Sequence, residues 1–366
     1  MRTVFVNGKF TAQPMTGVQR VASNLLRAVD RRLAAGASPL TRPWVLLCPA
    51  GAPLPELKAI EVRRVGRRVG SLHAWEQWAL PRAARTGLLL NLAGSAPWFA
   101  RAQVCMLHDA AVFDHPRAYT WMFRHWYSNL FRHLARRAER VLTVSDFSRR
   151  RLSATLGLAE RHIGVVPNGS DHLDGVIPDD SVLRRHGLVG VPYLLAVGSA
   201  NPTKNHTALR AAFAQRPAVD AARLVIVGGA DARVFAVGDG AGVSAGAGQA
   251  LQVGRVDDAQ LKALYQQAVG LVFPSLYEGF GLPALEAMAC GCPVAAADAA
   301  ALPEVCGGAA LLFDPHSVSA IASAMHTLLS DAGERGRLRA RGHARALAFR
   351  WDAAAGALLA QLARVA

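Results

Sequence analysis

The sequence predicts an α/β protein with two doubly wound, Rossmann-like domains that face each other across a cleft. Three observations predict this fold. The chain has 366 residues, enough for about two domains. Short β-rich runs alternate with longer helical segments in both halves of the chain, as in parallel sheets whose strands are joined by helices. Several runs in the second half are continuously apolar, which is typical of strands buried on both faces.

The first alternation predicts a domain over residues 1–170. Its expected helices cover 17–34 and 119–138, and its expected strands are 3–6, 44–47, 88–90, 104–107 and 141–144. A polar, proline-containing stretch follows Pro167-Asn-Gly169. Such a stretch is typical of a connection between domains, so we expect a linker over 171–190.

The second alternation predicts a domain over 191–345. Its expected strands are 193–197, 224–227, 271–273 and 294–296, and its expected helices are 207–215, 258–268 and 283–290. The segment 238–248 is rich in glycine and alanine and predicts a surface loop. The chain ends in a helical segment, 346–366, that could return to the first domain. In such folds ligands bind at the carboxyl ends of the strands, so functional residues should follow strands directly.

Composition narrows the partners and the compartment. The net charge of +15 favours acidic partners such as nucleic acid, anionic lipid headgroups or polyphosphates. Clusters such as Arg63-Arg64 and Arg149-Arg150-Arg151 lack the aromatic stacking motif of a nucleic-acid site, so we interpret them as solvated faces and expect no nucleic-acid partner. The apolar runs are too short or too interrupted to span a bilayer, and the first residues lack the longer apolar region and small-residue cleavage site typical of a signal peptide, so we expect none. We therefore expect a cytoplasmic protein.

Cysteine usage gives no sign of a metal or disulfide framework. The five cysteines are an odd number, and only Cys290 and Cys292 lie close together, without a nearby residue to complete a zinc site. We interpret them as buried thiols and expect neither a metal nor another cofactor.

The strongest chemical signal is the segment Glu278-Gly-Phe-Gly-Leu-Pro-Ala-Leu-Glu286, which follows the apolar strand 270–273. Its glycines let backbone amides approach a ligand closely, and the helix that begins near Pro283 offers free N–H groups to a phosphate. Carboxylates beside a phosphate would repel it, so Glu278 and Glu286 are better interpreted as acceptors for sugar and ribose hydroxyls. The simpler alternative is an ordinary helix start with two unrelated acidic residues.

Three further strand ends carry candidate residues. In Val197-Gly-Ser-Ala-Asn-Pro-Thr-Lys204, the lysine is a compact cation suited to a leaving diphosphate. His108 and Asp109 follow the strand 104–107, where Asp109 could cap the next helix. Gly17 opens an amphipathic helix after the first strand and could seat an anion. A surface lysine, a partly buried histidine and a simple helix start are the alternatives.

These motifs together resemble those of the retaining glycosyltransferases of family four, which share the two-domain GT-B fold. The segment from Glu278 through Cys290-Gly-Cys292 to Leu302-Pro-Glu304 resembles the family's Glu-x7-Glu signature. The resemblance implies that Glu278 contacts the transferred sugar and that Glu286 binds the ribose. It also implies that the backbone of Gly279, Phe280, Gly281 and Leu282 approaches the donor.

The same resemblance assigns the remaining candidates. Lys204 would neutralise the diphosphate, and His108 would lie near the donor sugar, so His108, Lys204 and Glu278 are the expected catalytic residues. Gly17 belongs to a loop similar to the family's acceptor and phosphate loop. The segment Val253-Gly-Arg-Val256-Asp resembles the loop that reads the nucleobase. Where the family usually carries an arginine, this chain has Ser199 or Ala200, which leaves the phosphate more dependent on Lys204 and main-chain amides.

The resemblance implies a reaction. The first domain would hold the acceptor and the second the nucleotide sugar. The hexose would be transferred with retention, without a metal ion, by a front-side displacement in which the departing diphosphate oxygen helps to deprotonate the acceptor. Val6-Asn-Gly-Lys-Phe10 and Thr16-Gly-Val-Gln-Arg20 resemble bacterial enzymes that add mannose or rhamnose to lipopolysaccharide O-chains or exopolysaccharide. GDP-mannose is the expected donor and a glycan or lipid-linked molecule the expected acceptor.

Alternatives remain open at this level. A GT-B nucleotide-sugar epimerase would use a similar donor site, and a basic nucleic-acid-binding protein would account for the charge alone. A glycoside hydrolase also uses two carboxylates, but it needs them on opposite sides of the scissile bond and has no evident use for Lys204. Lipid-linked acceptors would favour association of the basic first domain with the anionic inner face of the cytoplasmic membrane.

Overall fold

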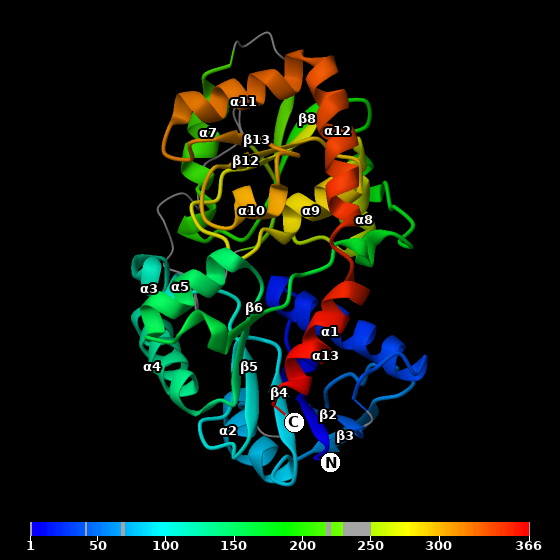
Figure 1. Ribbon diagram of the computed structural model, residues 1–366. Helices are drawn as coiled ribbons and strands as arrows, with labels where there is room; N and C mark the ends of the chain where they lie inside the picture. The colour runs from blue at the N-terminus through cyan, green and yellow to red at the C-terminus, as the bar shows by residue number, and fades with distance from the viewer. Residues whose placement is uncertain (1, 41, 67–69, 217–220, 230–249, 366) are drawn as a thin grey trace. The chain divides into compact units, whose positions relative to one another are not determined.

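The chain forms two units, each with its own parallel sheet (Figure 1). The computed structural model describes residues 2–40, 42–66, 70–216, 221–229 and 250–365. The first unit comprises Met1–Phe113, His125–Gly169 and Arg350–Ala366, and the second comprises Asp114–Arg124 and Ser170–Phe349. The loop expected over 238–248 lies outside the described residues.

The first unit contains a seven-stranded sheet in the order β3-β2-β1-β4-β5-β6-β7, with parallel pairing throughout. From β1 the sheet is extended on one side by β2 and β3 and on the other side by β4 to β7, so the topological switch point lies between the neighbouring strands β1 and β4. The strands are β1 Val4–Asn7, β2 Trp44–Pro49, β3 Glu61–Val65, β4 Leu88–Asn91, β5 Gln103–Met106, β6 Arg140–Thr143 and β7 Ile163–Val165.

The helices of this unit connect the parallel strands. They are α1 Gly17–Ala34, α2 Leu72–Ala83, α3 Ala111–Asp114, α4 Trp121–Arg137, α5 Asp146–Leu156 and the C-terminal α13 Trp351–Ala363. The first residues of α4 and the end of α3 belong by contact to the second unit. Helix α13 packs along α1, and the guanidinium of Arg32 donates to both carboxylate oxygens of Asp352 at 2.7 and 2.6 Å. The end of the chain is therefore part of the first unit.

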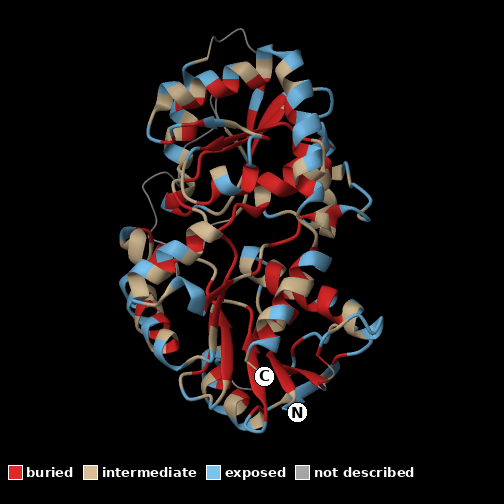
Figure 2. Cartoon of the chain, viewed as in Figure 1, coloured by how far each residue is buried: buried red, intermediate tan, exposed pale blue. Residues whose placement is uncertain are grey.

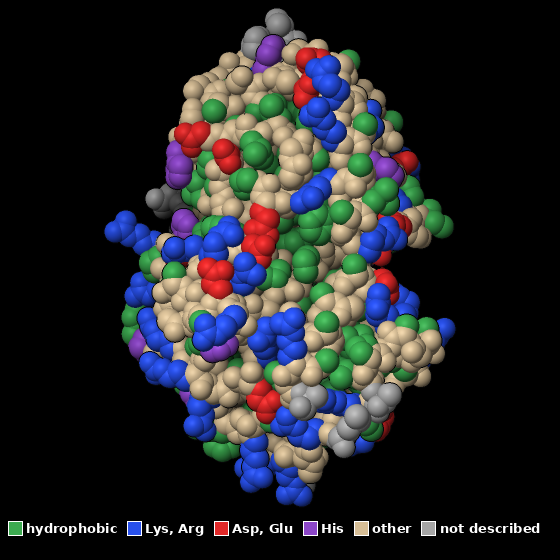
Figure 3. All heavy atoms as spheres, in the orientation of Figure 1, with side chains coloured by type: hydrophobic (Ala, Val, Ile, Leu, Met, Phe, Trp, Pro, Cys, Tyr) green, Lys and Arg blue, Asp and Glu red, His purple; other side chains and the backbone are tan. Residues whose placement is uncertain are grey.

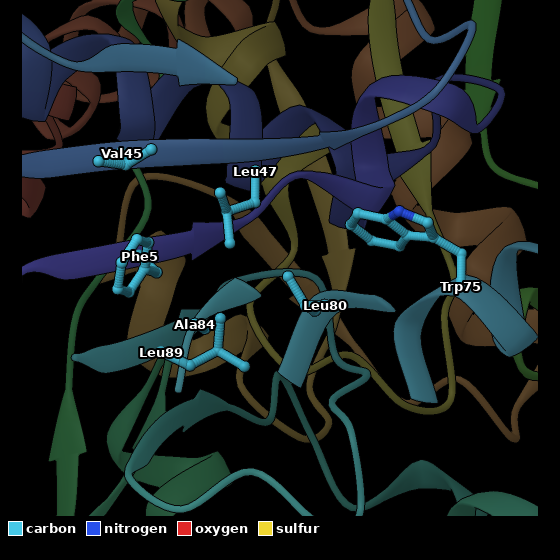
Figure 4. Packing of buried hydrophobic residues seen from close by; sticks show 7 residues of the cluster. All are labelled: Phe5, Val45, Leu47, Trp75, Leu80, Ala84 and Leu89. Carbon is cyan, nitrogen blue, oxygen red and sulfur yellow. The ribbon is translucent and has the colours of Figure 1, made fainter. Parts of the chain in front are cut away.

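A core cluster joins α2 to the sheet (Figure 4). It contains Phe5, Val45, Leu47, Trp75, Leu80, Ala84 and Leu89, all buried. The indole N–H of Trp75 donates to the carbonyl oxygen of Val65 at 2.8 Å, so this large side chain is buried without losing its hydrogen bond. Each large apolar side chain here contributes about 1.5–3 kcal/mol by leaving water.

The second unit contains a six-stranded parallel sheet in the order β10-β9-β8-β11-β12-β13, which reverses between β8 and β11. Most strands of both sheets are buried, as Figure 2 shows. The strands are β8 Tyr193–Val197, β9 Arg223–Val227, β10 Leu251–Gly254, β11 Gly270–Phe273, β12 Val294–Ala297 and β13 Leu311–Phe313. The predicted fold class, two doubly wound parallel-sheet domains, is confirmed.

Helices also connect these strands. They are α6 Ser181–Arg185, α7 His206–Ala214, α8 Asp258–Gln267, α9 Leu282–Ala289, α10 Leu302–Cys306, α11 Val318–Ser330 and α12 Ala332–Leu347. The stretch 171–190, expected as a linker, carries the 3₁₀ turn Asp171–Leu173 and helix α6, which pack against α8 and α9. None of the described helices is both long and apolar enough to cross a membrane.

The sequence did not predict β3, β7, β10 or β13. Strand β3 carries Arg63 and Arg64 and is largely exposed, so it lacks the apolar run that marks a buried strand. Strands β7, β10 and β13 have only three or four residues each. All four lie at or near a sheet edge, where short and polar strands are common.

Candidate functional site

The candidate site of the second unit lies where the strand order reverses. Strands β8 and β11 are neighbours. Lys204 lies in the 3₁₀ turn Pro202–Lys204 after β8, and Glu278 lies in the loop after β11. The N–H of Leu276 donates to the carbonyl oxygen of Thr203 at 2.8 Å and ties the two loops together. Parallel topology therefore brings residues that are 74 positions apart to one edge of the sheet.

Lys204 and Glu278 form an ion pair at this edge. Their side chains are 18% and 13% exposed, so both charges are mostly shielded from water but reachable. The lysine stem packs against Gly198, and its ammonium lies 5.5 Å from the ring centre of Phe273, a cation–π contact. Burial, with the charge of Lys204, lowers the pKa of the adjacent His206 to about 4. His206 is thus neutral at pH 7.

The loop after Glu278 leads into the start of helix α9. Gly281 precedes the helix with φ of +95°, a left-handed conformation that favours glycine, and an added Cβ would lie 2.4 Å from Leu302 Cδ2. The residue before the helix, Gly281, has no side chain to cap it, and the N–H of Ala284 donates to the carbonyl oxygen of Gly281 at 3.0 Å. The helix dipole therefore favours an anion here, beside Lys204.

Glu286 is held inside the unit. It is 3% exposed, and its two oxygens lie 3.0 Å from His172 Nε2 and 3.1 Å from the hydroxyl of Tyr265. Burial, followed by the charge of Glu286, raises the pKa of Tyr265 well above its usual value, so the phenol remains a donor. The sequence offered no sign of His172 or Tyr265. Both lie outside α9, and packing of the turn 171–173 against α8 and α9 helps to bring them to Glu286.

Two expected donor residues, Ser199 and Val256, lie in the loops after β8 and β10 and are half-buried. The unexpected residue is Arg255, next to Val256. A methyl group added at Gly229 would lie 2.9 Å from Arg255 Nε, and the Gly229 carbonyl accepts a hydrogen bond from the N–H of Ala200 at 3.2 Å. Arg255 therefore lies near the loop that carries Ser199 and Ala200. This arginine stands in the sequence segment already singled out, one residue before Val256.

His108 follows β5 in the first unit. Its Nε2 lies 2.9 Å from the carbonyl oxygen of Leu92, which can only accept, so Nε2 carries the proton of the neutral ring. Burial lowers the pKa of His108 to about 4 although the Leu92 bond opposes the shift. His108 is thus neutral at pH 7 with Nδ1 as an acceptor. Asp109 Oδ1 accepts from the N–H of Ala111, the first residue of α3, at 2.8 Å, two residues before the helix.

Gly17 begins helix α1 and is exposed. The preceding Thr16 does not cap the helix with its side chain and instead bonds to the side chain of Gln19. An added Cβ at Gly17 would meet no atom within 4 Å. The start of α1 therefore offers N–H groups to an anion, but packing within the unit does not require glycine at this position.

A buried polar cluster at the switch point of the first unit was not predicted. Lys9 follows β1, and its Nζ lies 2.6 Å from Glu76 Oε2, with side chains 3% and 1% exposed. Glu76 Oε1 also accepts from Asn7 at 2.9 Å and from Ser95 at 2.7 Å. The lysine was visible in the sequence, but its partners come from α2 and from the loop after β4.

These positions divide between the two units. In the second unit, the structure brings Lys204 and Glu278 into contact, places Gly279 to Leu282 at the start of α9, and buries Glu286 within α9. His108 and Gly17 follow strands β5 and β1 of the first unit. Two Rossmann-like units, one with a cation and a carboxylate at its switch point, define a protein of the GT-B class.

Comparison with known proteins identifies the family. Residues 15–172 match the family described as Glycosyltransferase Family 4, and residues 184–345 match Glycosyl transferases group 1. The O-antigen chain mannosyltransferase B of Escherichia coli is 32% identical over 259 residues, which cover 68% of this chain and 67% of that protein. The chain belongs to the family-four, group 1 glycosyltransferases and is a glycosyltransferase.

Two further similarities bear on specificity and fold. The serotype-specific mannosyltransferase WbdA of Escherichia coli is 29% identical over 272 residues, covering 71% of this chain but only 32% of WbdA. The sucrose-phosphate synthase of Thermosynechococcus elongatus superposes over 100% of this chain and 98% of its own, with a TM-score of 0.74 and 22% identity. The second similarity supports the GT-B fold alone.

Proposed function

We propose that this glycosyltransferase moves a hexose, with retention of configuration, from a nucleoside diphosphate sugar to a glycan or lipid-linked acceptor. The observation that carries the proposal is the Lys204–Glu278 pair at the switch point of the second sheet, in the loops that precede helices α7 and α9. A cation beside a helix N-terminus suits a diphosphate, and a carboxylate beside them suits sugar hydroxyls.

In this mechanism the diphosphate lies at the start of α9 and Lys204 stabilises the negative charge that develops as the glycosidic bond breaks. The Glu278 carboxylate accepts hydrogen bonds from hydroxyls of the transferred sugar and holds its orientation. The departing phosphate oxygen takes the proton of the acceptor hydroxyl on the same face of the sugar, so the configuration is retained. Positive charge comes from protein groups rather than from a metal ion.

Arg255 is proposed as the second cation of the donor site. It packs over Gly229, which is hydrogen-bonded to the loop at Ala200 where the family's arginine is missing. A guanidinium that approaches from the loop after β10 can bind phosphate oxygens with two parallel hydrogen bonds.

His108 and Glu286 are proposed to bind the donor through their remaining acceptor atoms. His108 Nδ1 would accept from a sugar hydroxyl, because Nε2 already donates to Leu92. Glu286 would accept from ribose hydroxyls, since an ionised carboxylate offers about four acceptor positions. In this arrangement His172 and Tyr265 act as positioning residues.

Mannose is the proposed sugar and GDP-mannose the proposed donor. The two Escherichia coli relatives support this choice, because both are named mannosyltransferases and one acts on an O-antigen chain. The acceptor would accordingly be a growing cell-surface polysaccharide or its lipid-linked precursor.

A peripheral position on an anionic membrane is part of the proposal. Lysine and arginine side chains spread over the face of the first unit that Figure 3 shows. Two large aromatic side chains of this unit, Trp78 and Phe99, are 64% and 82% exposed, and Arg82 lies over the Trp78 ring. Exposed aromatic and basic side chains together suit the headgroup layer of a bilayer. The double variant Trp78→Ser/Phe99→Ser should sediment less with anionic vesicles, and unchanged sedimentation would argue against this position.

The reaction is tested by transfer assays on purified variants. Lys204→Met and Glu278→Gln should each lower transfer by about hundredfold or more, in the range of a lost transition-state contact. The matched controls Lys58→Met and Glu56→Gln change residues of the first unit that lie outside the candidate site, and they should retain transfer. Near-normal turnover in Lys204→Met or Glu278→Gln would remove that residue from the site.

Donor identity is tested separately by thermal shift of the wild-type chain with GDP-, UDP- and dTDP-sugars. Stabilisation by GDP-mannose alone is expected. Stabilisation by another nucleotide sugar would correct the donor, and conversion of the donor to an epimer without transfer would favour an epimerase.

A further inference from the structure

A basic pocket of about 490 Å³ lies in the first unit, away from the residues assigned to donor binding. Its lining includes four arginines and one carboxylate: Arg140, Arg149, Arg161, Arg364 and Glu160. They come from β6, α5, the 3₁₀ turn Glu160–His162 and the residue after α13. The volume lies within the range of about 300–1,000 Å³ that is usual for small-molecule sites.

The pocket lies near the amino end of strand β6, whereas the candidate site residues follow the carboxyl ends of their strands. Arg140 is the first residue of β6, whereas His108 follows the end of the neighbouring parallel strand β5. The wall of the pocket is the terminal strand β7, whose outer side no other strand of the described sheet covers. The donor and acceptor chemistry at the carboxyl edge therefore does not account for this cluster.

Charge in the pocket is not balanced. Arg149 forms ion pairs with both nearby carboxylates, Asp146 at 3.1 Å and Glu160 at 3.2 Å. Arg140 donates through Nε to the neutral side-chain oxygen of Gln361 at 3.1 Å. Within the described part of the chain, no carboxylate pairs with the guanidinium of Arg161 or Arg364. Among the described residues, three guanidinium charges thus share the pocket without an acidic partner.

Burial and the neighbouring Arg364 both act on the Arg140 guanidinium. Burial and, after it, the nearby charge of Arg364 lower the pKa of the Arg140 guanidinium. The Arg140–Arg364 arrangement is repulsive, and folding gains nothing from it unless an anion joins the two groups. The Gln361 side chain packs directly against the backbone of Gly164, where an added Cβ would lie 2.5 Å from the Gln361 oxygen. The wall behind Arg140 is therefore closely packed rather than loose.

We propose that this pocket is a second anion site that binds a phosphate-bearing ligand through Arg140, Arg161 and Arg364. Planar guanidinium groups match phosphate oxygens with paired hydrogen bonds, and three of them in one concave site favour a group with more than one negative charge. The phosphate belongs either to a soluble metabolite or to a lipid headgroup. The proposal does not depend on the assignment of the donor site.

The test is calorimetric titration of inorganic pyrophosphate into the full chain, in a Lys204→Met background that silences phosphate binding at the candidate donor site. The change Arg161→Gln/Arg364→Gln should weaken pyrophosphate binding by about tenfold or more, because each charged hydrogen bond to phosphate contributes at least that factor. Neither side chain has a described carboxylate partner, so the variant should melt at the same temperature as its background. The matched control Arg85→Gln removes an exposed arginine of the same unit and should change binding less than about twofold.

A second arm identifies the source of the phosphate. The same variants are sedimented with vesicles of phosphatidylglycerol in phosphatidylcholine and with pure phosphatidylcholine. Pocket-dependent binding of pyrophosphate alone supports a soluble ligand, and pocket-dependent binding of the anionic vesicles supports a headgroup. The proposal is overturned if the Arg161→Gln/Arg364→Gln variant binds both pyrophosphate and anionic vesicles as its background does, or if the background binds neither.

Discussion

The buried Lys9–Glu76 pair gives the sharpest prediction for stability. Glu76 accepts three hydrogen bonds, from Lys9 at 2.6 Å, Ser95 at 2.7 Å and Asn7 at 2.9 Å, in a site where its side chain is 1% exposed. The variant Glu76→Ala leaves the Lys9 ammonium buried without its carboxylate. Breaking a buried pair from one side costs about 3–5 kcal/mol, so we expect the free energy of unfolding of the first unit to fall by about 4 kcal/mol.

Removing both charges should cost less than removing one. In Lys9→Met/Glu76→Leu no charge remains buried, and the remaining loss comes from the donors of Asn7 and Ser95. Glu76→Ala leaves the same two donors without their acceptor and in addition leaves the Lys9 ammonium unpaired, so the double variant should be the more stable of the two. The exposed pair Arg2–Glu139, with side chains 43% and 29% exposed, provides the matched control. Glu139→Ala should lower stability by less than about 1 kcal/mol.

Urea unfolding followed by tryptophan fluorescence measures this effect in the intact chain. Six of the seven tryptophans lie in the first unit, so the signal reports mainly on that unit. A loss below about 1 kcal/mol in Glu76→Ala, equal to the Glu139→Ala control, would show that the pair is not buried as described. A double variant as unstable as Glu76→Ala would show that the orphaned charge is not the cause.

Three other predictions concern single residues of the candidate site. Gly281→Ala should lower the stability of the second unit by about 2 kcal/mol or more and abolish transfer, because φ is +95° and the added Cβ meets Leu302. The control Gly17→Ala, which has open space around the added Cβ, should leave the melting temperature unchanged. Equal losses of stability in the two variants would refute the backbone argument. His108 has a pKa of about 4, below its usual 6.5, so as pH falls from 6.5 to 4 the unfolded chain binds a proton that the folded chain does not, and stability is lost. The free energy of unfolding of His108→Asn, measured in urea, should therefore depend less on pH in this window. A slope equal to that of the wild type would contradict this prediction. Arg255→Gln should raise KM for the nucleotide sugar about tenfold with a smaller change in KM for the acceptor, and an unchanged donor KM would exclude Arg255 from phosphate binding.

Most buried strands were predicted from the sequence, whereas the exposed strand β3 was not. Buried strands such as β8 and β11 were predicted because a short, continuously apolar run is typical of a strand covered on both faces. The exposed strand β3, with Arg63 and Arg64, was not, because its pairing with β2 is decided by backbone hydrogen bonds that leave no hydrophobic pattern. The candidate site shows the same division. Lys204 and Glu278 were predicted individually from the loops they occupy, but their contact was not.

The sequence by itself determined the local features of this protein: the alternation of strands and helices, the glycine and proline at the start of α9, and the loop residues that resemble a glycosyltransferase. Only the tertiary structure decided which distant side chains meet. It paired Lys9 with Glu76, enclosed Glu286 between His172 and Tyr265, and gathered Arg140, Arg161 and Arg364 in one pocket. The physical reason is that local patterns encode each element, whereas contacts between side chains far apart in sequence depend on strand order and helix packing.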